Sequence, residues 1–182
     1  NQFIEDNNHN WYYLGKDGKP VTGAQTIDTF NLYFHEDGRQ AKNEIVTING
    51  DSYYFDKDNG RRVTGLHYVD GANHKYSGYY YFDKDGKMVK DDFVTENGNT
   101  YYFDATGYQP NFVFVSDKAG NWYYMSDFKA TKGFSGTMRF STTFIDRSQA
   151  HNKTITKELY GEQYYFDPKT GIMVTNRYIS DD

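Results

Sequence analysis

Tyr80-Tyr81-Phe82-Asp83-Lys84-Asp85-Gly86 decides the fold, because the chain repeats this pattern of an aromatic cluster followed by a turn glycine. Seven aromatic clusters occur, at residues 11–14, 32–34, 53–55, 80–82, 101–103, 122–125 and 164–166. Six of them are followed within a few residues by a glycine: Gly18, Gly38, Gly60, Gly86, Gly107 and Gly171. The clusters follow one another at steps of 20, 21, 27, 21, 22 and 41 residues. A period of about 21 residues predicts a stacked array, because one such unit cannot bury its apolar face alone.

Each unit reads as a β-hairpin, in which Tyr80–Phe82 forms one strand and residues 87–90 return after the Asp-Gly turn. The turn glycines are expected to supply the positive φ that such turns need. The variant at residues 56–60 is one residue longer, which predicts a bulged turn. The linking segments, such as residues 43–50 and 92–98, are typical of a further short strand that ends in a turn. The fold class predicted is therefore all-β, a β-solenoid of stacked short β-hairpin repeats of about 21 residues, with almost no helix.

The repeat is interrupted in two places. Residues 67–77 hold an insertion of six residues beyond the usual step, which predicts a longer loop. The last step is about twice the others and predicts a degraded copy at Thr143-Phe144-Ile145-Asp146, with its glycine lost. The irregular stretch is expected to build atypical extended strands around its large apolar residues, Phe134, Met138, Phe140 and Phe144.

The whole chain, residues 1–182, is interpreted as one repeat domain. Regular repeats cover about 9–127, the irregular stretch covers about 128–160, and a final repeat covers about 161–178. Degenerate repeats often cap solenoids, so one end of the array is expected to close at the irregular stretch. No clear boundary between two domains is visible in the sequence.

Composition narrows the class of protein. Hydrophobic residues make up 37% of the 182 residues, and 35 residues are aromatic (19 Tyr, 14 Phe and 2 Trp), so the buried material must consist mostly of rings. Such a core suits a narrow stack better than a wide globule. The net charge is −5 without a basic stripe, which argues against a nucleic-acid partner. No long apolar run is present, so no membrane span is expected.

Two further features concern the origin of the chain. Cysteine is absent, which excludes disulfides, thiolate metal sites and cysteine nucleophiles together. Residues 1–10 are polar and do not resemble a signal peptide. The sequence is therefore expected to be a fragment or a mature segment of a larger protein.

The repeat unit resembles a known bacterial family. Its aromatic-Tyr-Phe-Asp box, turn glycine and Gly23-Ala24-Gln25-Thr26-Ile27-Asp28 segment are similar to the cell-wall-binding type repeats of glucan-binding proteins. Leu32-Tyr33-Phe34 and the stretch from Asp37 to Lys42 fit best the glucan-binding domain of glucansucrases, the secreted enzymes that build dextran-like α-glucans from sucrose. The resemblance covers nearly all of the chain except roughly residues 128–160.

The resemblance implies sugar pockets between neighbouring units, in which a Tyr stacks on glucose while Gln and Lys bind its hydroxyls. One unit has all of these parts, and the sugar-binding residues expected are Gln25, Tyr33, Gln40, Lys42 and Tyr54. A weaker second sugar site is expected at Tyr102 and Gln109. In other units the residues matching Gln40 and Lys42 differ: Pro20 and Thr22, Met88 and Lys90, Gln109 and Asn111, Met173 and Thr175.

The same site can be argued from the residues. Gln40 and Lys42 are two positions apart on a return strand and share a face. Tyr33 lies on the paired strand, where it is expected to form the floor between them. A flat ring beside amide and ammonium donors suits a sugar, which has an apolar face and a rim of hydroxyls. The alternative is that Tyr33 is one more packed ring of the core and that the two polar side chains are solvated.

The resemblance also implies the partners and the location. The expected partners are α-glucan or isomalto-oligosaccharides and the catalytic domain of a parent enzyme, with no nucleic acid, no membrane and no cofactor, in an extracellular or cell-surface location. A rival hypothesis is an adhesion module that anchors a protein to choline or cell-wall polymer. The choline cage of related modules needs pairs of Trp, and only Trp11 and Trp122 occur.

Catalytic and metal-binding readings have little support. The acidic residues recur in turns at the repeat period, which no single active site requires. The segment Asp83–Gly86 lacks the spacing of an EF-hand loop, so no metal is expected. A purely structural spacer stays possible on these grounds.

Overall fold

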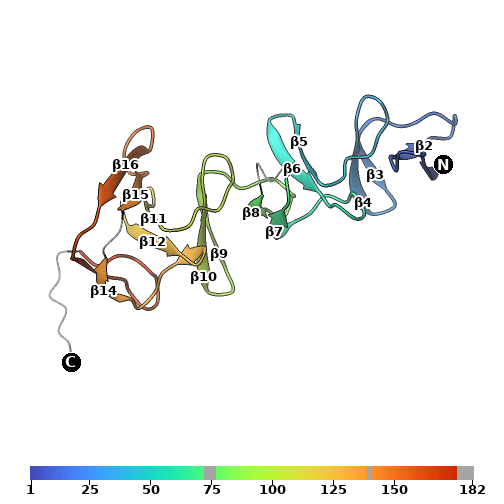
Figure 1. The fold of residues 1–182 in the computed structure, drawn as a ribbon. Helices are drawn as coiled ribbons and strands as arrows, with labels where there is room; N and C mark the ends of the chain where they lie inside the picture. The colour runs from blue at the N-terminus through green and yellow to red at the C-terminus, as the bar shows by residue number, and fades with distance from the viewer. Residues whose placement is uncertain (72–76, 139–140, 176–182) are drawn as a thin grey trace. The chain divides into compact units, whose positions relative to one another are not determined.

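The computed structural model of the chain describes residues 1–71, 77–138 and 141–175, and these residues form strands and turns without any helix. They divide into two compact units, Asn1–Lys90 and Asp91–Asp182. Figure 1 shows both units as short strands joined by turns. The expectation of an all-β chain is confirmed. Among the described residues, no helix exists that is long and apolar enough to cross a membrane.

The described residues of the first unit form four antiparallel hairpins (Figure 1). Each hairpin forms a two-stranded sheet, and its second strand carries the aromatic cluster. The pairs are β1 (Gln2–Glu5) with β2 (Trp11–Leu14), β3 (Gly23–Ile27) with β4 (Phe30–Phe34), β5 (Glu44–Ile48) with β6 (Asp51–Phe55), and β7 (Gly65–Val69) with β8 (Gly78–Phe82).

The aromatic strand pairs with the strand before it, which corrects the hairpin expected from sequence. In β5–β6 the register runs from Glu44↔Phe55 to Ile48↔Asp51 and closes through Asn49-Gly50, both of which have positive φ (53° and 91°). A two-residue turn of this kind matches the right-handed twist of the flanking strands. The segment after the turn glycine forms only one bridge to the aromatic strand, as in Phe82↔Met88. The linking segments are therefore the main partners, and the return strands are minor ones.

The chain changes direction at the Asp-x-x-Gly turns. The side chain of the first aspartate stabilises each turn by accepting hydrogen bonds from backbone N–H groups within it. Asp83 Oδ1 accepts the backbone N–H groups of Asp85 (2.8 Å) and Lys87 (2.9 Å), and Gly86 N–H donates to the Asp83 carbonyl (2.9 Å). All six turn glycines have positive φ, between 68° and 86°, as expected. In the longer turn Gly60 N–H reaches back four residues to the Asp56 carbonyl, rather than three.

Within the first unit, successive repeats are hydrogen bonded to one another through one backbone N–H. The second residue after the turn glycine donates to a carbonyl of the aromatic strand of the preceding repeat. These bonds are Gln40 N to Trp11 O (2.7 Å), Arg62 N to Asn31 O (2.9 Å) and Met88 N to Ser52 O (2.8 Å). The same type of bond therefore recurs along the first unit at the repeat period.

Three turn glycines of the first unit, Gly38, Gly60 and Gly86, lie directly against the preceding repeat, which is a second reason for their recurrence. A Cβ on Gly38 would lie 2.6 Å from Pro20 Cβ, and a Cβ on Gly86 would lie 2.9 Å from the Arg62 side chain. A Cβ on Gly60 would overlap the amide of Gln40. A glycine is thus required both for its positive φ and for the close approach of two repeats.

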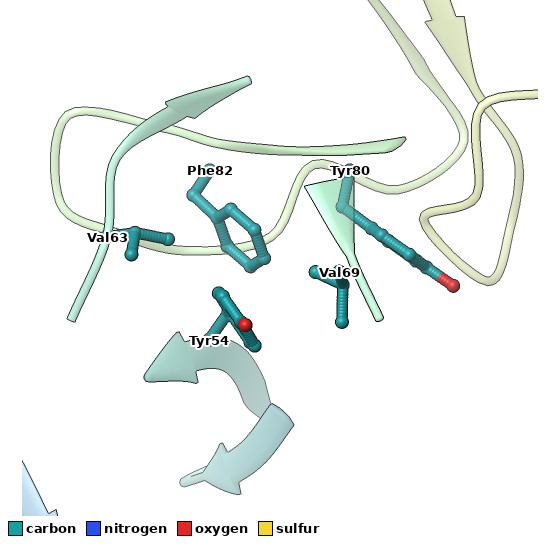
Figure 2. Close-up of a cluster of buried hydrophobic side chains, with 5 residues drawn as sticks. All are labelled: Tyr54, Val63, Val69, Tyr80 and Phe82. Atoms are coloured by element: carbon teal, nitrogen blue, oxygen red, sulfur yellow. The ribbon is translucent and has the colours of Figure 1, made fainter. Parts of the chain in front are cut away.

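The buried material of the first unit consists of rings packed between neighbouring repeats. Tyr54, Tyr80 and Phe82 form one cluster with Val63 and Val69 (Figure 2). The rings of Tyr54 and Phe82 come from successive aromatic strands and stack with their centroids 6.1 Å apart. Aromatic side chains supply most of the apolar area that each short hairpin can bury.

The second unit begins as a regular repeat and then departs from the pattern. Its strands are β9 (Asp92–Glu96), β10 (Asn99–Phe103), β11 (Val113–Ser116), β12 (Trp122–Ser126), β13 (Lys129–Ala130), β14 (Ser135–Met138), β15 (Ser141–Asp146), β16 (Lys153–Glu158) and β17 (Glu162–Tyr165). Hairpin β9–β10 closes through Asn97-Gly98, as in the first unit. Five strands then form one sheet in the order β13-β12-β11-β15-β16.

The degraded repeat copy has become part of this sheet (Figure 1). Residues 143–146 lie in β15, which pairs parallel with β11 and antiparallel with β16. The Phe114 and Phe144 rings stack with centroids 4.6 Å apart and an interplanar angle of 4°. Asp146 Oδ1 still accepts the N–H of Ser148 (3.1 Å), as the aspartates of the regular turns do two residues on.

Large apolar residues of the irregular stretch lie in or beside its strands. Met138 lies in β14 and Phe144 in β15, whereas Phe134 immediately precedes β14. Phe140 and the last residues of the final repeat, 176–178, lie outside the described residues. In the segment with the insertion, residues 67–69 belong to β7 and residues 72–76 lie outside the described part.

Candidate functional site

A pocket of about 350 Å³ lies between successive repeats of the first unit. Apolar and aromatic side chains make up much of its wall, and amide and charged groups complete it. Its lining residues are Phe3, Trp11, Ile27, Asp28, Phe30, Leu32, Gln40, Lys42, Asp58, Asn59 and Arg61. This set is called the Trp11 pocket. Its volume is within the usual range of small-ligand sites.

The Trp11 pocket brings together Gln40 and Lys42, as the sequence predicts. Lys42 Nζ lies 4.9 Å from the centroid of the Trp11 ring and donates a hydrogen bond to the Asp58 carbonyl (3.2 Å). Gln40 is 5% exposed, and its Nε2 donates to the Asn59 carbonyl (3.1 Å). Gln40 therefore has a structural role as well, because it fills the space under the next turn.

Tyr33 does not form the floor of this pocket. Phe34 pairs with Gln40 across the bridge, so alternation places Leu32 opposite Lys42 and turns Tyr33 to the other face. There Tyr33 packs against Ala41 and Tyr53, with its ring 6.0 Å from that of Phe55. The expected floor is replaced by rings from other strands, above all Trp11 of the preceding repeat.

Gln25 and Tyr54 are also separate from the Trp11 pocket. Gln25 lines a smaller hollow of about 90 Å³, and its Nε2 donates to the Thr22 carbonyl (2.7 Å). Tyr54 is 3% exposed and donates its hydroxyl to Asn43 Oδ1 (2.8 Å). Burial, together with the charges of nearby aspartates, raises the pKa of Tyr54. Its ring belongs to the cluster of Figure 2 and is not available for stacking on a sugar.

The residues expected to form a weaker second site are both buried in the second unit. Tyr102 is 1% exposed, donates its hydroxyl to Asp91 Oδ1 (3.1 Å), and has a pKa raised by burial and by the charge of Asp91. Gln109 is also 1% exposed and donates to the Phe128 carbonyl. A ligand at either side chain would first have to open the packing of the unit.

Sequence reasoning missed the aromatic residues of the Trp11 pocket and one of its two cations, Arg61. Trp11 belongs to the repeat before that of Gln40. The sequence signal that could have predicted their contact is the repeat period, because it stacks these two repeats. The Arg61 guanidinium lies 3.2 Å from the centroid of the Phe30 ring, and Arg61 directly follows the longer turn. The added residue of that turn is the sequence feature that could have indicated the unusual position of Arg61.

The electrostatic character of the pocket is balanced. Asp28 and Asp58 oppose Lys42 and Arg61, and both cations lie over aromatic faces. A neutral ligand with hydroxyl groups suits such a wall better than an ion of either sign. In the described part of the chain, no group of three or more His, Asp or Glu side chains is placed to hold a metal ion.

Comparisons with known proteins agree with the repeat. Residues 21–66 and 63–109 match the family described as "Choline-binding repeat", and residues 1–19 and 114–127 match "Putative cell wall binding repeat". Glucosyltransferase-I of Streptococcus downei is 33% identical over 182 residues, which is 99% of this chain and 8% of that protein. Glucosyltransferase-S of Streptococcus mutans serotype c is 34% identical over 203 residues, which is 99% of this chain and 14% of that protein.

Solved structures support the same fold. The crystal structure of choline binding protein F from Streptococcus pneumoniae superposes with a TM-score of 0.60 at 22% identity, over 95% of this chain and 47% of that chain. Identity at this level shows the fold alone. The glucosyltransferases are much longer proteins, of which this chain spans less than a fifth. The chain thus belongs to the family of choline-binding and cell-wall-binding repeats, and it is homologous to a segment of streptococcal glucosyltransferases.

Proposed function

We propose that the chain is a non-catalytic carbohydrate-binding module that holds α-glucan, with the Trp11 pocket as its main sugar site. The observation that carries the proposal is the pocket itself, which combines aromatic faces with Gln40 and Lys42 at a junction of two repeats. Homology to glucosyltransferases supports glucan as the polymer, because such proteins handle glucosyl units. Gln25, Tyr33 and Tyr54 support the fold around the pocket in this proposal, rather than the sugar.

The chemistry of the pocket fits one glucose unit. The Trp11 and Phe30 rings and Leu32 offer apolar contact to a pyranose face, while the amide of Gln40 and the ammonium of Lys42 offer polar groups to its hydroxyls. For a sugar to stack on either ring, the Lys42 or Arg61 side chain must move to the rim, which long flexible side chains allow. A single small site gives modest affinity, so retention of a polymer gains from more than one contact.

The proposal includes a β-solenoid for the first unit. Three equivalent hydrogen bonds between successive repeats, from Gln40, Arg62 and Met88, support a stack that advances by one hairpin per repeat. The close contacts of Gly38, Gly60 and Gly86 with the preceding repeat support the same arrangement. A stack of this kind leaves space between neighbouring hairpins, where the Trp11 pocket lies.

The proposed biological role is to tether glucan beside a catalytic domain of the parent enzyme, outside the cell. A tethered polymer raises the local concentration of acceptor chains at the catalytic domain. The short share of the relatives that the chain covers is consistent with an auxiliary segment.

The second candidate function is attachment to choline or a cell-wall polymer. The match to choline-binding repeats favours it, and Trp11 is the type of ring that such ligands use. Against it, Lys42 and Arg61 already lie over the aromatic faces of the Trp11 pocket, and their charge repels a quaternary ammonium. Choline therefore serves as the competing ligand in the test of this proposal.

The test is migration of the full chain in native gels that contain dextran. The wild-type chain is expected to be retarded, and the variants Trp11→Leu and Lys42→Met are expected to lose most of this retardation. Lys90→Met is the matched control, because Lys90 occupies the position equivalent to Lys42 two repeats later and donates instead to Ser52 Oγ (2.9 Å). Unchanged migration of the wild type in dextran, or retention on choline resin alone, would overturn the proposal.

A further inference from the structure

A second hollow, of about 390 Å³, lies within the second unit on one face of hairpin β9–β10. It is separate from the Trp11 pocket and from the expected pair Tyr102 and Gln109. Phe93, Thr95 and Thr100 come from the hairpin, and the turn after β11 contributes the opposite wall. Tyr123 of β12 and Arg147 after β15 complete it. This set is called the Arg147 hollow.

The hairpin and β12 provide a ring surface and hydroxyl groups side by side. Phe93 and Thr95 are two positions apart on β9 and share a face, and Thr95 pairs with Thr100 across the hairpin. The two threonine hydroxyls lie 3.2 Å apart. The Phe93 and Tyr123 rings meet with centroids 5.0 Å apart at 47°. Rings and hydroxyls in one hollow are the combination that a sugar needs.

Arg147 is a fixed part of this hollow and not a solvated cation. Its side chain is 1% exposed, and its Nε donates to Asp91 Oδ1 (2.9 Å) while its Nη2 donates to the Asp91 carbonyl. Asn152 Nδ2 donates to the other carboxylate oxygen of Asp91 (2.9 Å). The backbone N–H of Arg147 donates to Ser116 Oγ (2.6 Å). A group held at this many points keeps its position when a ligand arrives.

The charges around the hollow select a neutral ligand. Asp92 and Asp117 balance Arg147 and Lys118 in the lining, so no net charge favours an ion of either sign. The Arg147 guanidinium lies 5.4 Å from the Phe93 ring centroid, so the ring face is already paired with a cation. Around a neutral polyol, the carboxylates supply hydrogen-bond acceptors, the guanidinium supplies donors, and the threonine hydroxyls supply both.

We propose that the Arg147 hollow is a second sugar site, which takes one glucosyl unit of the same α-glucan and makes the chain bivalent. This inference rests on the proposed function, because it assigns a second point of contact to the same polymer. Two sites on one chain raise the apparent affinity for a long polymer well above that for a short oligosaccharide.

The experiment fills the hollow without touching its core. Ala119 lines the hollow from an exposed turn, so Ala119→Trp places a large side chain into it. Ala105→Trp is the matched control, since Ala105 is also exposed in a turn of this unit and does not line the hollow. Isotope-labelled full-length chain is titrated with isomaltotriose, and amide shifts of residues around each site are followed separately.

The expected result is two sets of shifts in the wild type, one around Trp11 and one around Phe93 and Thr95. Ala119→Trp should remove the second set of shifts and leave the first unchanged. Lys42→Met should lower the affinity reported by the first set by about tenfold and leave the second unchanged. On dextran, Ala119→Trp should reduce apparent affinity by at least about tenfold, because bivalence is lost, while Ala105→Trp should leave it unchanged.

Other outcomes separate this inference from the proposed function. Shifts around Trp11 alone, unaffected by Ala119→Trp, would overturn the second site and leave the proposed function in place. An absence of shifts anywhere in the wild type would overturn both. Shifts around Phe93 caused by choline but not by isomaltotriose would show a site for a quaternary ammonium, which also contradicts the proposal. A Thr95→Val, Thr100→Val variant repeats the test without added bulk.

Discussion

The same repeat position is exposed in the regular repeats and buried in the degraded one. The residue after the box aspartate is Lys57 or Lys84 in regular repeats, where the side chains are 65% and 88% exposed. In the degraded repeat it is Arg147, which is 1% exposed and paired with Asp91. The first unit depends on ring clusters between hairpins, whereas the second also depends on a polar network around one arginine. Loss of the turn glycine after Asp146 thus accompanies a change from surface turn to core.

The largest expected effect breaks this polar network. Arg147→Met should destabilise the second unit by about 3–5 kcal/mol, because removing one partner leaves the Asp91 carboxylate without its counter-charge. Lys84→Met, at the equivalent position of a regular repeat, should change stability by less than about 0.5 kcal/mol. Urea unfolding followed by tryptophan fluorescence measures both variants. Equal effects would show that the two positions do not differ energetically.

The next effect tests the close stacking of regular repeats. Gly60→Ala should destabilise the chain by roughly 2–4 kcal/mol, because the added methyl group meets both positive φ and the amide of Gln40. Gly50→Ala is the control, since Gly50 also has positive φ but has nothing within 4 Å of its Cβ position. It should cost about 1 kcal/mol. A similar loss in both variants would mean that backbone conformation alone requires the glycine.

The acid dependence of stability should distinguish the second unit. Burial raises the pKa of Asp91, but the hydrogen bond from Asn152 and the charge of Arg147 outweigh it and leave the pKa below its ordinary value of 3.8. A lowered folded-state pKa stabilises the fold above the unfolded value, and this is lost as the pH falls through the folded value. Asp91→Asn should therefore be less stable than wild type at pH 7, and the difference should shrink as the pH falls below 3.8. A difference that stays constant down to pH 2 would contradict this origin.

The smallest expected effect on stability separates the two roles of Gln40. Regular repeats place Met88 and Met173 at the equivalent position, so Gln40→Met should change unfolding free energy by less than about 1.5 kcal/mol. The same variant should reduce retention on dextran if the Gln40 amide contacts sugar. Thermal unfolding and dextran gels on one preparation compare the two. Full retention with unchanged stability would remove Gln40 from the proposed site.

Much of the fold could be predicted, because the period and the turn chemistry are local. The strand at each aromatic cluster, the positive φ of Gly86 and its equivalents, and the strand at residues 143–146 all follow from short sequence patterns. The choice of strand partner could not be predicted in this way. The chain contains two kinds of turn signal, one of the type Asn49-Gly50 and one of the type Asp83–Gly86. Only the geometry of each type of turn decides which one closes the longer ladder of strand pairs.

The candidate site was predicted less completely than the fold. Gln40 and Lys42 share a face, as alternation along a strand requires, and they line one pocket. The sequence predicts that Tyr33 joins them, but the bridge register turns it to the opposite face. Trp11 and Arg61 come from other repeats, and no pattern within one hairpin shows which distant side chains complete its wall.

The sequence by itself determined the repeat unit, its turns and the aromatic character of its core, because each depends on residues within about 20 positions of one another. Tertiary structure alone decided which rings face solvent and which are packed, because that depends on how one hairpin meets the next. It also decided that Arg147 is buried, since the free energy of a buried guanidinium depends on Asp91, which lies 56 residues away.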